Sequence, residues 1–284
     1  MTAFAEQEDV EFVLTDKHFR IIAKIIREEA GIALSPIKTT LVYSRLTKRL
    51  RALELESFQQ YCDIISDPKN KEERRHLLSA LTTNVTHFFR EPHHFKHLAD
   101  VTGPSLIDRA RRGERVRLWS AACSSGQEPY SLALTLLKLA PDLADTNLKI
   151  LATDIDPKIL DQARNGEYEK SLLEKIPGDL RARYFSRVTG NGELRVISDE
   201  VKSLISFRTL NLVRPWPVSG PFDAVFCRNV VIYFDEKTEQ KVWSQFSNVI
   251  APNGHLYIGH SERVTGPASN VLLPDGVTIY KNSC

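Results

Sequence analysis

The fold is decided by the stretch Val116-Arg-Leu-Trp-Ser-Ala-Ala-Cys-Ser-Ser-Gly-Gln-Glu-Pro-Tyr-Ser131 together with Lys149-Ile-Leu-Ala-Thr-Asp-Ile-Asp156. The pattern predicts a strand, a tight turn of small residues, a helix, a second strand and an acidic residue at the end of that strand. In an open α/β sheet such a turn lets the backbone approach a ligand, and the acidic side chain accepts hydrogen bonds from ribose hydroxyls. The two segments therefore predict a nucleoside site.

The turn after the first strand contains a single glycine, Gly126. The glycines of a G-x-G-x-x-G turn are replaced by other small residues: Ala121, Ala122, Cys123, Ser124 and Ser125. Because this removes the backbone cradle for a pyrophosphate, a dehydrogenase that binds NAD or FAD is disfavoured. S-adenosylmethionine has no phosphate and needs no such cradle, so the turn favours a methyltransferase.

The composition is that of an ordinary globular protein, with 284 residues of which 42% are hydrophobic and 26% charged. A net charge of +2 is too small to indicate nucleic-acid binding by the whole molecule. The cysteines form no C-x-x-C pair, which indicates reduced thiols. The acidic N-terminus has no apolar run typical of a signal peptide, and no stretch is long enough to cross a bilayer. We therefore expect a cytoplasmic protein without membrane insertion.

The hydrophobic pattern changes along the chain. Residues 1–81 predict an all-α N-terminal domain, 82–100 a linker, and 101–284 alternating strands and helices. That alternation predicts an α/β fold with a mostly parallel, Rossmann-like sheet. Residues 182–202 interrupt it with a predicted antiparallel β-hairpin that turns at Gly190-Asn-Gly192.

Polar residues follow several of the predicted strands. Asp154 ends the second strand, Asn211 follows Ile205–Thr209, and Arg228 and Asn229 follow Phe222–Cys227. Because the carboxyl ends of parallel strands meet at one edge of a sheet, we expect these side chains in one crevice. Asp156 precedes Pro157 and is predicted to cap the next helix, which leaves Asp154 for the ribose.

The chain resembles the CheR family, S-adenosylmethionine-dependent methyltransferases that esterify glutamates of bacterial chemoreceptors. The resemblance rests on Leu81–Glu91, Ser120–Ser131, Thr153–Asp156 and Phe226–Asp235, and it covers nearly the whole chain. It implies S-adenosylmethionine as cofactor, S-adenosylhomocysteine as product and a function in chemotaxis adaptation.

The resemblance also implies functional residues. Arg90 and Tyr233 match positions near the reacting methyl and the incoming carboxylate, and we expect them to be catalytic. The residues expected to bind the cofactor are Asn84, Thr86, Arg90, Glu128, Asp154, Asn211, Leu212, Arg228 and Asn229. A glutamate with a pKa of about 4.3 is already ionised at neutral pH, so the reaction needs no general base.

A predicted helix near residues 36–53 carries a basic arc on a helical wheel, opposite an apolar one. Its cations are Lys38, Arg45, Lys48, Arg49 and Arg51. We expect this face to recognise the receptor's methylation helices. A solvated basic face, or one that binds phosphate without specificity, is the alternative.

The predicted hairpin resembles a lobe on which some family members bind a receptor's C-terminal tail by strand addition. Its turn, Val188–Glu193, is shorter and poorer in glycine than in those members, so we expect an enzyme that does not depend on a receptor tail.

The histidines His93, His94 and His97 raise the question of a metal site. His93 and His97 are four residues apart on a predicted helix, but no H-E-x-x-H motif and no third ligand accompany them. We therefore expect surface histidines and no metal.

Two other functions compete with this reading. A methyltransferase of the same fold could act on a small molecule or RNA, although the basic arc has no stacking aromatics among its charges. A regulatory module could bind the cofactor without turnover, which Arg90 and Tyr233 argue against. We expect a monomer with chemoreceptors as partners and no nucleic acid.

Overall fold

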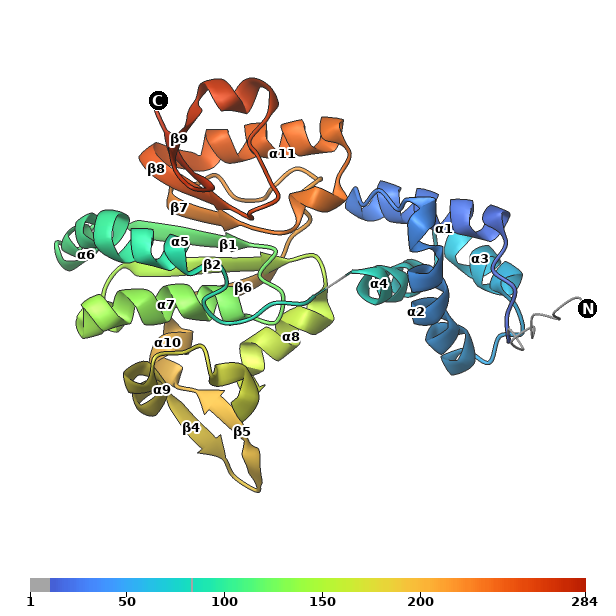
Figure 1. The fold of residues 1–284 in the computed structure, drawn as a ribbon, viewed down its shortest axis with the longest axis horizontal. Coiled ribbons are helices and arrows are strands. Elements are labelled where there is room, and N and C mark those ends of the chain that lie inside the picture. Colours follow the sequence, from blue (N-terminus) through green and yellow to red (C-terminus); the bar gives the residue numbers. More distant parts are fainter. Residues whose placement is uncertain (1–10, 83) are drawn as a thin grey trace, which may run out of the picture. The chain divides into compact units, whose positions relative to one another are not determined.

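The computed structural model describes residues 11–82 and 84–284. The chain divides into two compact units between Thr83 and Asn84, and Figure 1 colours them along the sequence. Asn84 is the first residue of the second unit.

The regular elements of the first unit, within its described residues 11–82, are helices. Its helices are α1 (Asp16–Ala30), α2 (Thr39–Ala52), α3 (Phe58–Ser66) and α4 (Lys71–Leu81), with a 3-10 turn at Pro36–Lys38. Thr15 caps α1 by accepting the N–H of His18, and Gly31 ends it in the left-handed conformation at φ 72°. The predicted all-α domain is confirmed.

The second unit, within residues 84–284, contains a seven-stranded sheet in the order β6-β2-β1-β7-β8-β10-β9. Strands β6 to β8 of that order are parallel, and β10 and β9 are antiparallel. The strands are β1 (Val116–Ala121), β2 (Leu148–Asp154), β6 (Ile205–Thr209), β7 (Phe222–Cys227), β8 (Ile250–Ile258), β9 (Leu272–Gly276) and β10 (Ile279–Asn282). The predicted α/β class with a mostly parallel sheet is confirmed.

Helices cover both faces of this sheet (Figure 1). They are α5 (Pro92–His97), α6 (Gly103–Arg111), α7 (Gln127–Leu139), α8 (Pro157–Asn165) and α11 (Glu236–Val249). Successive strand residues serve opposite faces: Leu118 packs in the core with α5, α6 and α7, whereas Trp119 packs with Trp243 and Phe246 of α11. The sheet is thus buried on both faces, as parallel sheets are.

The insertion is larger than the predicted hairpin. Strand β5 (Asn191–Ile197) pairs with β4 (Phe185–Val188) and also with β3 (Glu167–Glu169), which gives a small three-stranded antiparallel sheet. Helices α9 (Gly178–Tyr184) and α10 (Asp199–Ser203) flank it. The hairpin turns at Thr189 and Gly190, because Val188 pairs directly with Asn191, so the predicted Gly-Asn-Gly turn is wrong.

Over residues 11–82 and 84–284, no helix is both long and apolar enough to span a membrane.

Candidate active site

The turn after β1 adopts a left-handed backbone at three residues, although only one of them is a glycine. Ala122 has a φ of 61°, Ser124 of 51° and Gly126 of 95°. A residue with a Cβ costs about 1–2 kcal/mol in this conformation. The N–H of Ser124 donates to Asp154 Oδ2 at 2.8 Å, and the N–H of Cys123 to the carbonyl of Thr153 at 2.9 Å. These bonds to β2 hold the strained turn in place.

Asp154 lies buried at the carboxyl end of β2. Its second oxygen accepts the N–H of Asp156 at 3.0 Å, so both carboxylate oxygens are held by backbone donors. A carboxylate offers about four acceptor positions, which leaves capacity for ligand hydroxyls. Burial raises the pKa of Asp154, and the backbone N–H groups lower it in opposition. Asp156 accepts the N–H of Lys158 at 3.0 Å and caps α8, as predicted.

The segment that leads into α5 is fastened to this edge of the sheet. The hydroxyl of Ser124 donates to the carbonyl of Asn84 at 2.9 Å, and the N–H of Phe89 donates to the hydroxyl of Ser131 at 3.0 Å. Phe88 is buried, with ring contacts to aromatic residues of the inserted region. Thr86, half-buried, lies between these attachments. The predicted cofactor residues Asn84 and Thr86 are therefore on a segment held beside the β1 turn.

Arg228 is buried, with 2% of its side chain exposed, and lies between two carboxylates. Its guanidinium is 3.1 Å from Glu128 and 3.2 Å from Glu91, and it also donates to the carbonyl of Arg90. Glu128 is fixed in turn by the hydroxyl of Ser120 at 2.7 Å. The Arg228 side chain, predicted to bind cofactor, thus makes these contacts within the protein and positions the Arg90 backbone.

Glu91 was not predicted to have a role. One of its oxygens accepts the N–H and the Nδ1 of His260 at 3.2 and 3.0 Å, while the other faces Arg228. Burial would raise the pKa of Glu91, but the charge of Arg228 and the bonds from His260 outweigh it and lower the pKa to about 2. The carboxylate is therefore ionised and links the start of α5 to the ends of β7 and β8.

Glu262 is a second functional residue missed from the sequence. Its carboxylate accepts four backbone N–H groups, from Asn229 at 3.0 Å, Val230 and Val231 at 2.9 Å each, and Gly259 at 2.6 Å. Burial raises the pKa of Glu262, and these N–H groups lower it in opposition. The available signal was an acidic residue four positions after the last residue of a buried strand, at the edge where the other site residues were expected.

The remaining predicted residues lie on segments attached in this way. Asn229 has a φ of 58° and is held by Glu262 through its N–H. Tyr233 is half-buried and ends the 3-10 turn Val231–Tyr233, which begins at a residue bonded to Glu262. Arg90 is half-buried and donates to the carbonyl of Val85 at 3.2 Å.

Asn211 and Leu212 follow β6, the neighbour of β2. The oxygen of the Asn211 side chain accepts the N–H of Val213 at 3.1 Å, and Leu212 is buried. The N–H of Leu210 donates to the carbonyl of Asp154 at 2.9 Å. The predicted convergence of strand ends from β2, β6 and β7 at one edge is therefore present in the backbone.

The basic arc of the first unit is not a continuous exposed face. Arg45 donates to the carbonyls of Ala80 and Thr82 at 3.2 and 2.8 Å, which are orphan carbonyls at the end of α4. Arg49 forms a bidentate pair with Glu73 of α4, which is buried. These two arginines hold α2 against α4. The other three cations were placed differently: Lys48 is exposed, Lys38 is half-buried, and Arg51 is exposed and paired with Glu11.

The prediction that these histidines lie on the surface is wrong for one of them. His94 is fully buried, and burial lowers its pKa to about 3. Its ring contacts Phe226 and Tyr257, because α5 packs onto β7 and β8. A helical pattern of six residues does not show which face will meet the sheet.

This edge fits a nucleoside that carries hydroxyl and ammonium groups. It offers the carboxylates of Asp154 and Glu128 beside a turn whose backbone can approach a ligand, without the glycines of a pyrophosphate cradle. An open parallel sheet with this turn and an acidic residue ending its second strand defines an S-adenosylmethionine-dependent methyltransferase.

Comparison with known proteins gives the family. Residues 84–273 match the family described as CheR methyltransferase, SAM binding domain, and residues 17–82 match CheR methyltransferase, all-alpha domain. The chain belongs to the CheR methyltransferase family. It is 53% identical to a probable chemotaxis protein methyltransferase of Rhizobium etli, over 90% of this chain and 96% of that protein. It is 42% identical to the chemotaxis protein methyltransferase of Salmonella typhimurium (94% and 90%) and 41% identical to that of Escherichia coli (98% and 95%).

Proposed function

We propose that the protein methylates glutamate side chains of bacterial chemoreceptors in chemotaxis adaptation. The observation that carries this is the extent of the similarity: both units match the two parts of the family, and relatives that span nearly the same length are chemotaxis protein methyltransferases. The products would be a glutamate methyl ester and S-adenosylhomocysteine.

The residues of the site have distinct roles in this proposal. When bound, S-adenosylmethionine supplies an electrophilic methyl group. Asp154 would accept the ribose hydroxyls with the acceptor positions that Ser124 and Asp156 leave free. The other residues proposed to contact the cofactor are Asn84, Thr86, Arg90, Glu128, Asn211, Leu212 and Asn229, while Arg228 positions Arg90 and Glu128.

Catalysis would rest on orientation and on exclusion of water. The glutamate nucleophile is ionised at neutral pH, so no residue needs to remove a proton. Arg90 would orient the incoming carboxylate, and Tyr233 would line its approach. A carboxylate and a sulfonium give neutral products, so a dry site favours the reaction.

The test of this function is transfer of labelled methyl to receptor-containing membranes, measured as methanol released by alkali. Release is expected with the wild-type protein and is expected to fall at least tenfold in Arg90→Ala. Arg112→Ala is the matched control, because Arg112 is an exposed arginine that pairs with Glu114 away from the site. Cofactor binding without any methanol release would show a different acceptor or a cofactor sensor.

We also propose that the first unit recognises the receptor's methylation helices. Lys48 is the exposed cation of α2 that supports this role, since Arg45 and Arg49 are engaged with α4 and the exposed Arg51 is paired with Glu11. Lys48→Glu should reduce receptor methylation and make its loss with salt shallower, because less attraction is left to screen, while cofactor affinity stays unchanged. Lys69→Glu makes the same change at an exposed site outside α2. Equal effects of both variants would point to net charge alone.

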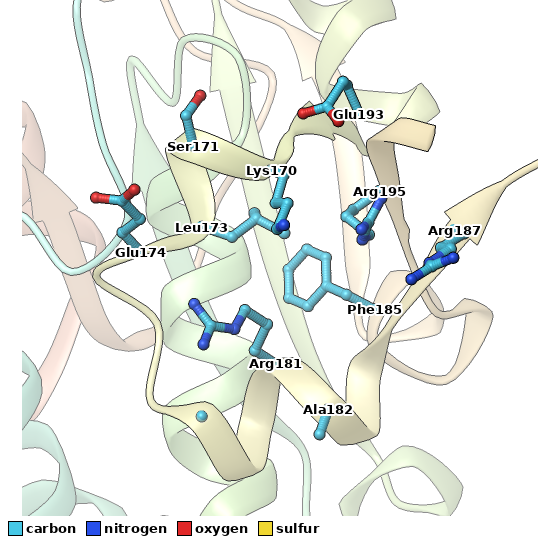
Figure 2. A pocket seen from close by; sticks show the side chains of 11 residues that line it. Lys170, Ser171, Leu173, Glu174, Arg181, Ala182, Phe185, Arg187, Glu193 and Arg195 are labelled. Carbon is cyan, nitrogen blue, oxygen red and sulfur yellow. The ribbon is translucent and has the colours of Figure 1, made fainter. Parts of the chain in front are cut away.

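We propose further that methylation does not require a receptor tail, because the hairpin turn consists of two residues, Thr189 and Gly190. Next to this hairpin is a pocket of about 750 Å³ (Figure 2). Its charged lining residues are Lys170, Arg181, Arg187, Arg195, Glu174 and Glu193. The excess of cations lies beside β4, which is an edge strand of the small sheet, and suits an acidic segment. This pocket is the feature that speaks against tail independence, so the proposal needs a direct test.

The test compares a receptor with one shortened at its C-terminus. Equal initial methylation rates are expected. If the shortened receptor reacts more slowly and Arg187→Ala removes the difference, the pocket binds the tail and tail independence is wrong.

We propose in addition that the protein acts as a cytoplasmic monomer without nucleic acid. Sedimentation with and without RNA would test the monomer and the absence of nucleic-acid binding.

A further inference from the structure

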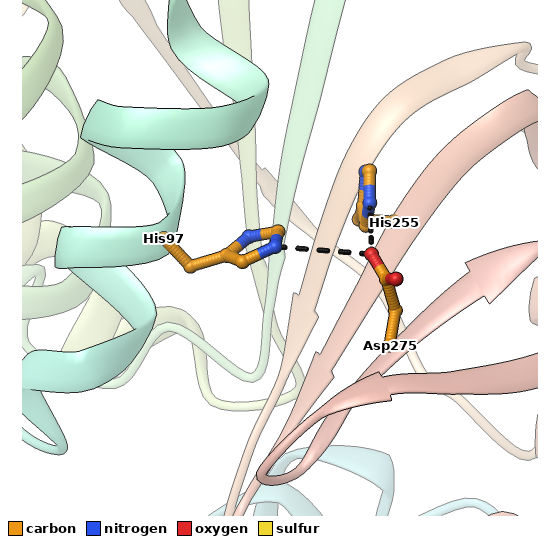
Figure 3. Close-up of side chains that lie close together, drawn as sticks. All are labelled: His97, His255 and Asp275. Carbon is orange, nitrogen blue, oxygen red and sulfur yellow. Dashed lines mark hydrogen bonds and ion pairs between the residues drawn. The ribbon is translucent and has the colours of Figure 1, made fainter.

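His97, His255 and Asp275 meet at a position that the methyl-transfer site does not use. They come from α5, β8 and β9, and Figure 3 shows the two imidazoles directed at one carboxylate. Asp275 Oδ2 is 3.0 Å from His255 Nε2 and 3.8 Å from His97 Nε2. His255 pairs with Ala224 near the amino end of β7, whereas the methyl-transfer residues follow the carboxyl ends of the strands.

The orientation of His97 is set by a second layer of hydrogen bonds. Its Nδ1 is 2.9 Å from the hydroxyl of Tyr257, which is 3.0 Å from the hydroxyl of Thr102. Thr102 can accept the Tyr257 proton, so that Tyr257 accepts the Nδ1–H of His97. This arrangement leaves a lone pair on Nε2, directed toward Asp275, and a hydrogen-bonded second nitrogen is typical of histidines that bind metals.

We propose that His97, His255 and Asp275 bind a divalent transition-metal ion of the Zn²⁺ type. Two imidazoles and one carboxylate are a donor set that Zn²⁺ accepts, with water in the fourth position. The ligand atoms all lie within 4.8 Å of one another. Ligands about 2.1 Å from a tetrahedral ion are roughly 3.4 Å apart, so small side-chain rotations close the site.

Access and packing support the proposal. The side chain of Asp275 is 39% exposed and that of His97 is 14% exposed, so an ion and its water can enter from solvent. A bound ion would join α5 to the antiparallel edge of the sheet. It would therefore act on the stability of the second unit rather than on the reaction.

The sequence had drawn attention to a different pair, His93 and His97, four residues apart on α5. His93 Nε2 instead lies 3.1 Å from the carbonyl of Val277 and 3.2 Å from the hydroxyl of Thr278. His255 and Asp275 are far from His97 in sequence, so no spacing rule could have connected them. His93 thus provides a matched control for the ligands of the proposed site.

The experiment titrates the full-length, untagged protein with Zn²⁺ by calorimetry and with Co²⁺ by visible absorption. We expect one ion per chain, Co²⁺ bands of a four-coordinate site, and a rise in Tm with Zn²⁺. Affinity should fall at least tenfold in His97→Gln, His255→Gln and Asp275→Asn, and about 10–100-fold in Tyr257→Phe. It should be unchanged in His93→Gln. Binding of S-adenosylhomocysteine would verify that each variant is folded.

Three results would overturn the proposal. The first is no binding of either ion to the wild-type protein. The second is binding that all the ligand variants retain. The third is loss of binding in His93→Gln equal to the loss in His97→Gln, which would place the ion on the helical pair.

Discussion

Single charged side chains of the second unit hold backbone in place at the crevice. Glu262 satisfies four N–H groups, Asp154 two, and Arg228 joins two carboxylates to a carbonyl. Buried charges are expensive unless each is paired. Here every one fixes a loop that carries a proposed functional residue, so their energetic effect and their positioning effect cannot be separated by deletion alone.

For Glu91, the stabilising effect of a paired, largely buried charge can be measured through its pH dependence. Its pKa of about 2 in the folded protein is below the ordinary 4.5, so its contribution to stability is complete above pH 4.5 and is lost as the pH falls toward 2. Glu91→Gln should lower the free energy of unfolding at neutral pH by about 3 kcal/mol. That deficit should shrink through the window from about pH 4.5 to about pH 2.

Urea unfolding of both proteins at a series of pH values checks this prediction. The difference between them cancels titrating groups that do not contact Glu91, whereas His94, whose Nδ1 is 3.5 Å from Glu91, stays coupled to it and titrates as part of the same pair. Glu174→Gln, at an exposed position, should show no such window. A deficit that stays constant down to the lowest pH would mean that the charge of Glu91 is not the stabilising feature.

Gly126 is the one glycine that the nucleoside turn retains, and the structure shows why. Its φ is 95°, and an added Cβ would lie 2.9 Å from the Tyr168 hydroxyl and 3.0 Å from Ala163 Cβ. Gly126→Ala should therefore lower the free energy of unfolding by about 3 kcal/mol, from backbone strain and overpacking together. Gly192→Ala, with no atom within 4 Å of its added Cβ, should change it by less than about 1 kcal/mol. Equal effects in urea unfolding would exclude this steric explanation.

At the scale of elements, the local hydrophobic pattern was sufficient to predict a strand or helix wherever that element buries apolar residues of its own. It predicted the strands Ile205–Thr209 and Phe222–Cys227 with the bounds that β6 and β7 have. It missed β3, which has three residues, and β9, which contains Pro274 and Gly276, because neither has a hydrophobic pattern of its own. Pairing with β5 and β10 makes them strands, and pairing is not visible in a single segment.

The candidate site shows the same division. The strand-end residues Asp154, Asn211 and Arg228 could be found because parallel strands end at one edge. Glu262 could not be assigned, because its partners are backbone N–H groups whose directions depend on the loop conformation. The helical wheel placed Arg49 in an exposed arc, since the wheel of α2 contains no information about Glu73 on α4.

The pair between Arg49 and Glu73 therefore predicts a structural effect where a binding effect had been expected. Arg49→Met leaves a buried carboxylate unpaired and should lower the free energy of unfolding of the first unit by about 3 kcal/mol. The double variant Arg49→Met with Glu73→Met should recover most of that loss, because two apolar groups can replace the pair. Chemical unfolding of both single variants and the double variant gives the coupling energy. Lys48→Met is the control for α2, and a coupling near zero would show that the pair is incidental.

At the scale of the whole molecule, the two units divide the proposed work. The residues proposed to contact the cofactor, and the groups that position them, lie in residues 84–284, whereas the proposed receptor contact Lys48 lies in the first unit. A fragment of residues 82–284 should therefore bind S-adenosylhomocysteine within about fivefold of the full-length affinity, a difference of roughly 1 kcal/mol. The same fragment should methylate receptor at least tenfold more slowly, because it lacks the docking unit.

Calorimetry and methanol release on the same preparation test both halves of this division. The full-length Lys48→Glu variant is the comparison, since it should lose receptor methylation for the same reason while keeping both units. A folded fragment that methylates receptor at the full rate would remove recognition from the first unit and leave it to the second. A fragment that is folded by circular dichroism but does not bind S-adenosylhomocysteine would show that the cofactor site needs residues before 82, which the contacts of Asn84, Arg228 and Glu262 argue against.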